Sequence, residues 1–173
     1  MDVMTLSYVN LLIGLAGVIL LSLIYKHAQS ERHLLFWVAA SFALCVHSTF
    51  GALHGAAIVL PYWLSPAAAN LSTISIHCFI LAALYTHLQR PFKYHWLIGL
   101  FLLSYVLNFT DFAQLSIVNR VLLNYPIIIA LNFLAIKLLL SQPRTQLTGV
   151  YRTLVLTFAI NISQLSIRLI LLG

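Results

Sequence analysis

Long apolar segments alternate with short segments that carry most of the charge, and this alternation constrains the fold more than any other feature. A helix needs about 20 residues to cross the hydrocarbon core of a bilayer. Backbone amides in lipid must be satisfied within their own segment, so apolar runs of this length form helices. The sequence contains six apolar runs, of which all but the fourth reach this length: Leu6–Tyr25, Leu34–Leu60, Ala67–Leu88, Tyr94–Phe109, Ile117–Leu140 and Val150–Leu172.

The runs predict an all-α polytopic membrane protein, a bundle of six transmembrane helices that forms a single domain over residues 1–173. The fourth run, Tyr94–Phe109, is shorter than a full crossing. We expect its helix to continue through Thr110 and Phe112 to complete the crossing. The strands of about ten residues with alternating hydrophobicity that a membrane barrel requires are missing from the sequence.

Composition excludes several classes of protein. A content of 62% hydrophobic and 7% charged residues, with a mean hydropathy of +1.00, lies outside the range of soluble domains. The net charge of +6 is spread over several loops and forms no basic patch with interleaved aromatic residues. We therefore expect the lipid bilayer as a partner and no nucleic acid. The acidic residues are only Asp2, Glu31 and Asp111, too few for carboxylate acid–base catalysis, so no catalytic residue is predicted.

The basic residues predict the orientation, because Lys and Arg favour the cytoplasmic side in short loops. Seven of the nine fall in or beside the first, third and fifth loops: Lys26, Arg32, Arg90, Lys93, Lys137, Arg144 and Arg152. These loops are expected in the cytoplasm and the N-terminus outside. The two remaining basic residues are Arg120 and Arg168.

Aromatic residues agree with this orientation. Tyr62 and Trp63 suit the outer membrane–water interface, and Tyr94 and Trp96 suit the inner one. Six crossings place the C-terminus outside as well. The sequence is still apolar at Gly173, which leaves two interpretations: a compact six-helix unit, or the front part of a longer protein with a further helix.

Polar side chains inside a bilayer are costly and usually face the interior of a bundle. On the last helix Thr157, Asn161, Gln164 and Arg168 recur at spacings of four, three and four, which predicts one continuous stripe. Most of the other intramembrane polar residues fall in the outer half of the bundle, so we expect a polar pocket reached from outside. The predicted ligand-binding residues are His47, His54, Asn70, His77, Asn124, Asn161, Gln164 and Arg168.

A structural role is the alternative for each of these residues. Interhelical hydrogen bonds are common in membrane bundles and are worth about 0.6–2 kcal/mol. The combination of His47, His54, His77 and Arg168 favours a binding function. A guanidinium cannot deprotonate to escape the cost of lipid.

Two histidines support a second hypothesis. We expect His47 and His77 at similar depth on neighbouring antiparallel helices, as the two axial ligands of one haem b would be. His47 and His54 share a helix face but lie about 10.5 Å apart along the axis, too far to chelate one metal ion. No metal site and no cofactor are predicted, and haem b is the alternative.

Several landmarks recur in a familiar order: Ser30-Glu-Arg-His-Leu-Leu-Phe-Trp37, His54-Gly55, Leu60-Pro-Tyr-Trp-Leu64, Ala69-Asn70, His87-Leu-Gln-Arg-Pro91 and Tyr151-Arg152. With the Arg168 helix, they make most of the chain resemble the multi-helix membrane sensor segments that precede GGDEF diguanylate cyclase domains in bacteria. That family commonly has one helix more than the six counted here. The resemblance implies a sensor of a ligand or of the membrane state, whose cyclase domain lies outside these residues.

The resemblance thus implies a sensory module of a bacterial signalling protein, in the inner (cytoplasmic) membrane. It would bind a small molecule from the outer side and change its helix packing. A homodimeric partner or an attached cytoplasmic domain would receive that change, with cyclic di-GMP synthesis as the implied output; enzyme activity itself stays open. The alternative is a b-type haem protein for redox sensing or electron transfer. A small transporter fits less well, because only Pro126 interrupts a helix and no inverted repeat is present.

Overall fold

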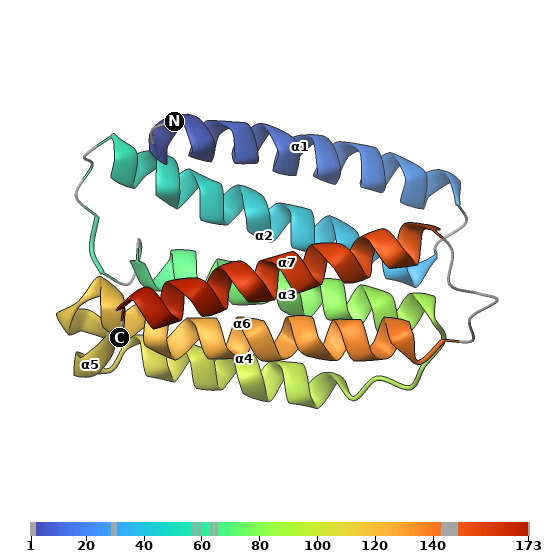
Figure 1. The fold of residues 1–173 in the computed structure, drawn as a ribbon. Helices are drawn as coiled ribbons and strands as arrows, with labels where there is room; N and C mark the ends of the chain where they lie inside the picture. The colour runs from blue at the N-terminus through green and yellow to red at the C-terminus, as the bar shows by residue number, and fades with distance from the viewer. Residues whose placement is uncertain are drawn as a thin grey trace.

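The computed structural model describes residues 3–28, 31–56, 58, 60–62, 64, 66–142 and 149–172. Asp2, Trp63 and Arg144, for which the sequence carries expectations, lie outside these residues. The described part of the chain is helical and contains no strand, which confirms the all-α prediction (Figure 1). Its helices are α1 (Val3–His27), α2 (Arg32–Gly55), α3 (Pro66–His87), α4 (Tyr94–Asn108), α5 (Asp111–Leu115), α6 (Ile117–Leu140) and α7 (Gly149–Leu172).

Five of these helices, α1, α2, α3, α6 and α7, are long and apolar enough to cross a membrane, and α4 is a shorter apolar helix. The fifteen residues of α4 extend about 22 Å, less than the ~30 Å of a hydrocarbon core. The expectation that this helix continues through Thr110 and Phe112 is wrong, because α4 ends at Asn108. Thr110 instead caps the separate helix α5, which begins at Asp111: the Thr110 hydroxyl accepts a hydrogen bond from the Ala113 backbone N–H at 3.4 Å.

The long helices lie side by side, with α1 packed against α2, α2 against α3, α3 against both α4 and α6, and α7 against α6 (Figure 1). The start of α1 and the end of α7 lie at the same end of the bundle, which we call the terminal end. We call the opposite end the basic end. Basic residues gather at this end, in the first or last turn of a helix or in the connection between α3 and α4. They include Lys26, Arg32, Arg90, Lys93, Lys137 and Arg152.

The main apolar core joins α3 and α6. Ile74, Cys78 and Leu81 from α3 pack against residues of α6 such as Leu131 and Leu139, all of them buried. Dispersion between closely fitted side chains stabilises such contacts in lipid, where apolar burial itself gains little. This core fills the bundle from its middle toward the basic end.

Small residues let α1 approach α2 closely. A Cβ atom on Gly14 would lie 2.7 Å from the Sγ of Cys45, and one on Gly17 would lie 2.7 Å from the Oγ of Ser41. Gly51 of α2 leaves similar room for the hydroxyl of Ser7. Close contact between small residues is a common way for helices to associate inside a membrane.

Candidate ligand-binding site

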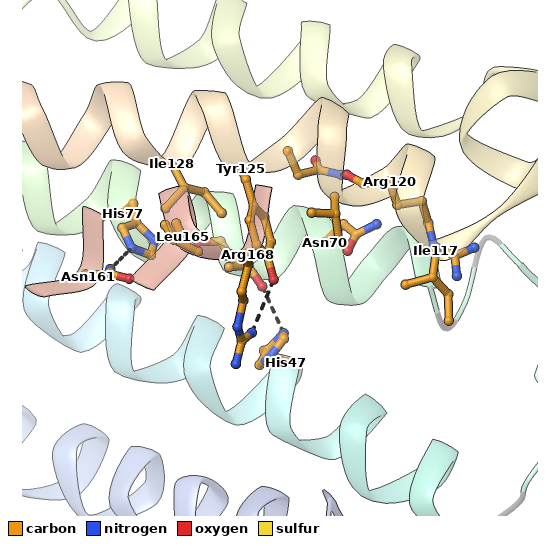
Figure 2. A pocket seen from close by; sticks show the side chains of 13 residues that line it. His47, Asn70, His77, Ile117, Arg120, Tyr125, Ile128, Asn161, Leu165 and Arg168 are labelled. Carbon is orange, nitrogen blue, oxygen red and sulfur yellow. Dashed lines mark hydrogen bonds between the residues drawn. The ribbon is translucent and has the colours of Figure 1, made fainter. Parts of the chain in front are cut away.

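A cavity of about 320 Å³ lies between α2, α3, α6 and α7 (Figure 2). Its residues come from the first half of α6 and the second half of α7, so it occupies the half of the bundle nearer the terminal end. Four lining residues are apolar: Ile117, Val121, Ile128 and Leu165. The polar lining consists of His47, Asn70, Thr73, His77, Arg120, Asn124, Tyr125, Asn161 and Arg168.

The packing order explains why space remains here. α3 packs against α2 on one side and against α6 on the other, and α7 packs against α6. In the described part of the chain, α2 and α7 do not pack against each other. The cavity is therefore a cleft with α2 and α7 as its two sides, and with α3 and α6 behind it.

Two guanidinium groups give the cavity its charge. Arg168, which is exposed, donates a hydrogen bond from Nη1 to the Tyr125 hydroxyl at 3.3 Å (Figure 2). The guanidinium carbon of Arg120 lies 5.7 Å from the centre of the Tyr62 ring, a cation–π contact. No aspartate or glutamate is among the residues that line the cavity. Arg168 and Arg120 therefore line the cavity in contact with neutral tyrosine side chains, Tyr125 and Tyr62.

The first histidine of the cavity, His47, is oriented by α3. Its Nδ1 lies 3.1 Å from the Ala69 carbonyl and 2.9 Å from the Thr73 hydroxyl oxygen. The Thr73 hydroxyl itself donates to the Ala69 carbonyl at 3.0 Å. A carbonyl only accepts, so these contacts assign the ring hydrogen to Nδ1 and leave Nε2 as an acceptor.

The second histidine, His77, joins α3 to α7. Its Nδ1 donates to the Thr73 carbonyl at 3.0 Å, and its Nε2 accepts a hydrogen bond from the Asn161 side-chain amide at 3.2 Å (Figure 2). Both nitrogens of this ring therefore have partners. For His77 to ligate a haem iron through Nε2, Asn161 would first have to release that nitrogen.

Three asparagines connect α3, α4 and α6 beside the cavity. The Asn70 amide donates to the Oδ1 of Asn108 at 2.9 Å, and Asn108 donates to the Oδ1 of Asn124 at 2.9 Å. Asn124 donates back to Asn108 at 3.2 Å. The Tyr62 hydroxyl adds a hydrogen bond to the Asn108 carbonyl at 2.8 Å. This network, with Asn108 fully buried at its centre, holds three helices together.

Six of the eight predicted ligand-binding residues line the cavity: His47, Asn70, His77, Asn124, Asn161 and Arg168. The other two, His54 and Gln164, are exposed and lie outside its lining. Gln164 and Thr157 also depart from the expected stripe on α7, since Thr157 is exposed and Leu165 takes the lining position between Asn161 and Arg168. Asn161 and Arg168 are seven residues apart, almost two helical turns, so they lie on the same face of α7. Gln164 lies outside that face.

The sequence did not single out Thr73, Arg120 and Tyr125 as ligand-binding residues, although they line the cavity. Thr73 lies one turn before His77 on α3, and Arg120 lies one turn before Asn124 on α6, so helical spacing from the predicted residues was the available signal. Tyr125 had no such signal, because its neighbours make it resemble an ordinary apolar aromatic residue.

The site is a positively charged cavity with the chemistry of a binding site. Among the described residues, no group of three or more His, Cys, Asp or Glu side chains could hold a metal ion. Its polar groups are arginine, histidine, amide and hydroxyl groups, which suit binding by charge and hydrogen bonds. Comparison with protein-family models, with curated proteins and with solved structures finds no match to this chain.

Proposed function

We propose that this chain is the membrane-embedded sensory module of a bacterial signalling protein, and that its ligand binds in the cavity between α2, α3, α6 and α7. In the proposed topology the chain crosses the inner membrane six times, with the N-terminus outside. The gathering of basic residues at one end of the bundle supports this orientation. The cavity then lies in the outer half of the bundle, and its ligand reaches it from the outer side.

One observation carries the proposal: Arg120 and Arg168 line the same cavity without any carboxylate in the lining. A guanidinium has five N–H donors and stays charged, and Arg168 directs one of them to the neutral Tyr125 hydroxyl. Hydrogen bonds between a guanidinium and an anion are about twice as strong as those between neutral groups. The cavity is therefore suited to a small anionic molecule.

The position of α7 suggests how binding would be transmitted. Two polar contacts link α7 to α3: Asn161 with His77, and the Tyr151 hydroxyl with the Nε2 of His87 at 3.0 Å. The first lies beside the cavity and the second lies at the basic end. A ligand that contacts Arg168 thus acts on the helix whose other end carries Tyr151.

At the basic end this contact continues into α2. The rings of His87 and His33 lie 4.7 Å apart, and the Nδ1 of His33 lies 3.2 Å from a carboxylate oxygen of Glu31. A ligand changes such an arrangement only if it binds two helix packings with different affinities. We propose that a shift of α7 is the change that the ligand selects, and that the cytoplasmic ends of α2, α3 and α7 pass it on.

The receiving partner is proposed from the resemblance to GGDEF sensor segments. It would be a diguanylate cyclase domain outside these residues, in a homodimer. The alternative b-type haem protein has one supporting observation, the shared cavity of His47 and His77. The hydrogen bond from Asn161 to His77 makes us rank it second.

Binding can be measured on the purified protein by thermal unfolding with inorganic phosphate, succinate and the neutral analogue succinamide. We expect the two anions to raise the unfolding temperature and succinamide to have little effect. Replacement of Arg168 by Gln should weaken anion binding about 10-fold or more, since a hydrogen bond to a charged group is worth about 1.5–3 kcal/mol.

Arg152→Gln is the matched control, because Arg152 is also an exposed arginine of α7 but lies at the basic end, away from the cavity. It should leave anion binding unchanged. Equal affinities in the Arg168→Gln and Arg152→Gln variants, or equal stabilisation by succinamide and succinate, would contradict the proposal.

A further inference from the structure

A second cavity, of about 430 Å³, lies between α3, α4 and α6 and shares no residue with the first. We call it the α4 groove. Its apolar lining comes from all three helices and includes Leu81, Leu97, Leu100, Leu131 and Leu134. The remaining lining residues lie toward the basic end: Tyr85, Pro91, Phe92, Lys93 and Trp96.

The connection from α3 to α4 lies at the basic end of the groove. α3 ends at His87, and the chain then runs through Pro91 and Lys93 without helical structure before α4 begins at Tyr94. Phe92 in this segment contacts both neighbouring tyrosine rings, with centroids 4.7 Å from Tyr85 and 4.9 Å from Tyr94. These contacts hold the segment across the basic end of the groove.

The groove is apolar along its length and cationic at one end. Lys93 is the only charged residue in its lining, and Arg90 lies three residues before it. Glu31, the described carboxylate at the basic end, lies within 3.2 Å of His33. Asp111 begins α5 at the terminal end of the bundle. Neither carboxylate is part of the groove, so the charge of Lys93 is available to a ligand.

The groove also opens on the surface of the bundle. Trp96 and Leu134, which line it from α4 and α6, are 69% and 44% exposed. Trp and Tyr are enriched where a membrane protein meets the headgroup region, and Tyr85, Tyr94 and Trp96 lie together here. An occupant would thus have an apolar part between the helices and an anionic part at the membrane surface.

We propose that the α4 groove binds an anionic phospholipid, with one acyl chain between α3, α4 and α6 and the phosphate at Lys93. Charge complementarity selects this occupant, because basic pockets between transmembrane helices bind anionic headgroups, whereas the quaternary ammonium of a zwitterionic lipid such as phosphatidylcholine offsets the charge of its own phosphate. In the topology proposed above, the lipid belongs to the cytoplasmic leaflet, where anionic lipids attract basic residues. The site does not depend on the ligand of the first cavity.

Trp96 reports occupancy of the groove directly. The sequence has three tryptophans, so the Trp37→Phe, Trp63→Phe chain keeps Trp96 as its only one. This chain is placed in phosphatidylcholine nanodiscs, and brominated phosphatidylglycerol or brominated phosphatidylcholine is added in increasing mole fraction. We expect the anionic lipid to quench Trp96 fluorescence at a mole fraction about fivefold lower than the neutral lipid does.

Variants of Lys93 separate headgroup selection from simple contact with bulk lipid. Lys93→Gln should remove the fivefold difference and Lys93→Arg should keep it, while the control Lys26→Gln, at the same end on α1, should leave it unchanged. Equal quenching by the two lipids in the parent chain would overturn the proposal, and so would a preference that survives Lys93→Gln. If Lys93→Gln fails to fold, Leu100→Phe gives a second test, because the larger side chain should partly fill the groove. The mole fraction of phosphatidylglycerol that quenches half of the Trp96 fluorescence should then rise. An unchanged mole fraction would overturn the proposal.

Discussion

Asn161 donates a hydrogen bond from its side-chain amide to the Nε2 of His77 across 3.2 Å, and this bond joins α7 to α3 beside the cationic cavity (Figure 2). The Thr73 carbonyl holds the other nitrogen of the same ring. His77 is therefore a fixed acceptor, and the position of α7 relative to α3 depends in part on one amide group.

Replacement of Asn161 by Leu should loosen α7. The change removes the bond and leaves the Nε2 of a half-buried histidine without its partner, which should lower the free energy of unfolding by about 0.6–1.7 kcal/mol. Reversible unfolding in mixed detergent micelles measures this. Gln164→Leu is the matched control, because Gln164 is exposed on the same helix outside the cavity, and this change should have little effect. Equal losses in both variants would show that the bond contributes nothing specific.

The asparagine network predicts a larger loss. Asn108→Leu removes the central partner of both Asn70 and Asn124. The buried Oδ1 of Asn124 then loses the donor Asn108, while its Nδ2 keeps the Arg120 carbonyl, so the free energy of unfolding should fall by about 1–3 kcal/mol. Asn10→Leu is the control and should be close to neutral, because Asn10 lies on α1, outside this network. A loss at Asn108 no larger than at Asn10 would mean that the three helices do not depend on these bonds.

The contact between α1 and α2 should be sensitive to a single methyl group. A Cβ at Gly14 would lie 2.7 Å from the Cys45 Sγ and 3.2 Å from two backbone atoms of α2, so Gly14→Ala should destabilise the protein by about 1–3 kcal/mol. Gly99→Ala on α4 meets no atom within 4 Å and should be neutral or slightly stabilising, since alanine favours the helix. The thermal unfolding temperatures of the two variants compare these effects, and a drop at Gly99 equal to that at Gly14 would refute the steric explanation.

Absorption spectra decide between the two proposed functions. The hydrogen bond that Asn161 donates to His77 leads us to expect that purified protein, expressed with haem supplied, has no Soret band. A red protein that loses its colour in the His77→Ala variant but keeps it in His87→Ala would instead establish His77 as an axial ligand.

The positions of the helices could be predicted from the sequence because a long apolar segment in lipid has one way to satisfy its backbone amides. The run Ala67–Leu88 predicts a helix, and α3 spans Pro66–His87. The short fourth run illustrates the limit of this reasoning. Its length shows that it is too short for a full crossing, but not that Thr110 caps a new helix, α5, instead of continuing α4.

For the candidate site, too, the sequence predicts some features and misses others. Helical spacing brought together the residues that share a face within one helix, such as Asn161 and Arg168, and depth suggested that His47 and His77 lie near each other. The exposure of Gln164 could not be deduced, because a stripe of polar residues is wider than the part of it that a neighbouring helix covers.

By itself, the sequence determined that this chain consists of apolar helices, where most of them begin and end, and which loops carry the positive charge. These properties follow from hydrogen bonding and hydropathy within each segment. Tertiary structure alone decided that α7 packs on α6 and leaves a cleft beside α2, and that Asn108 is the centre of a network shared by three helices. Such features depend on which helices become neighbours and how each is rotated, and those choices are made by contacts between segments far apart in the chain.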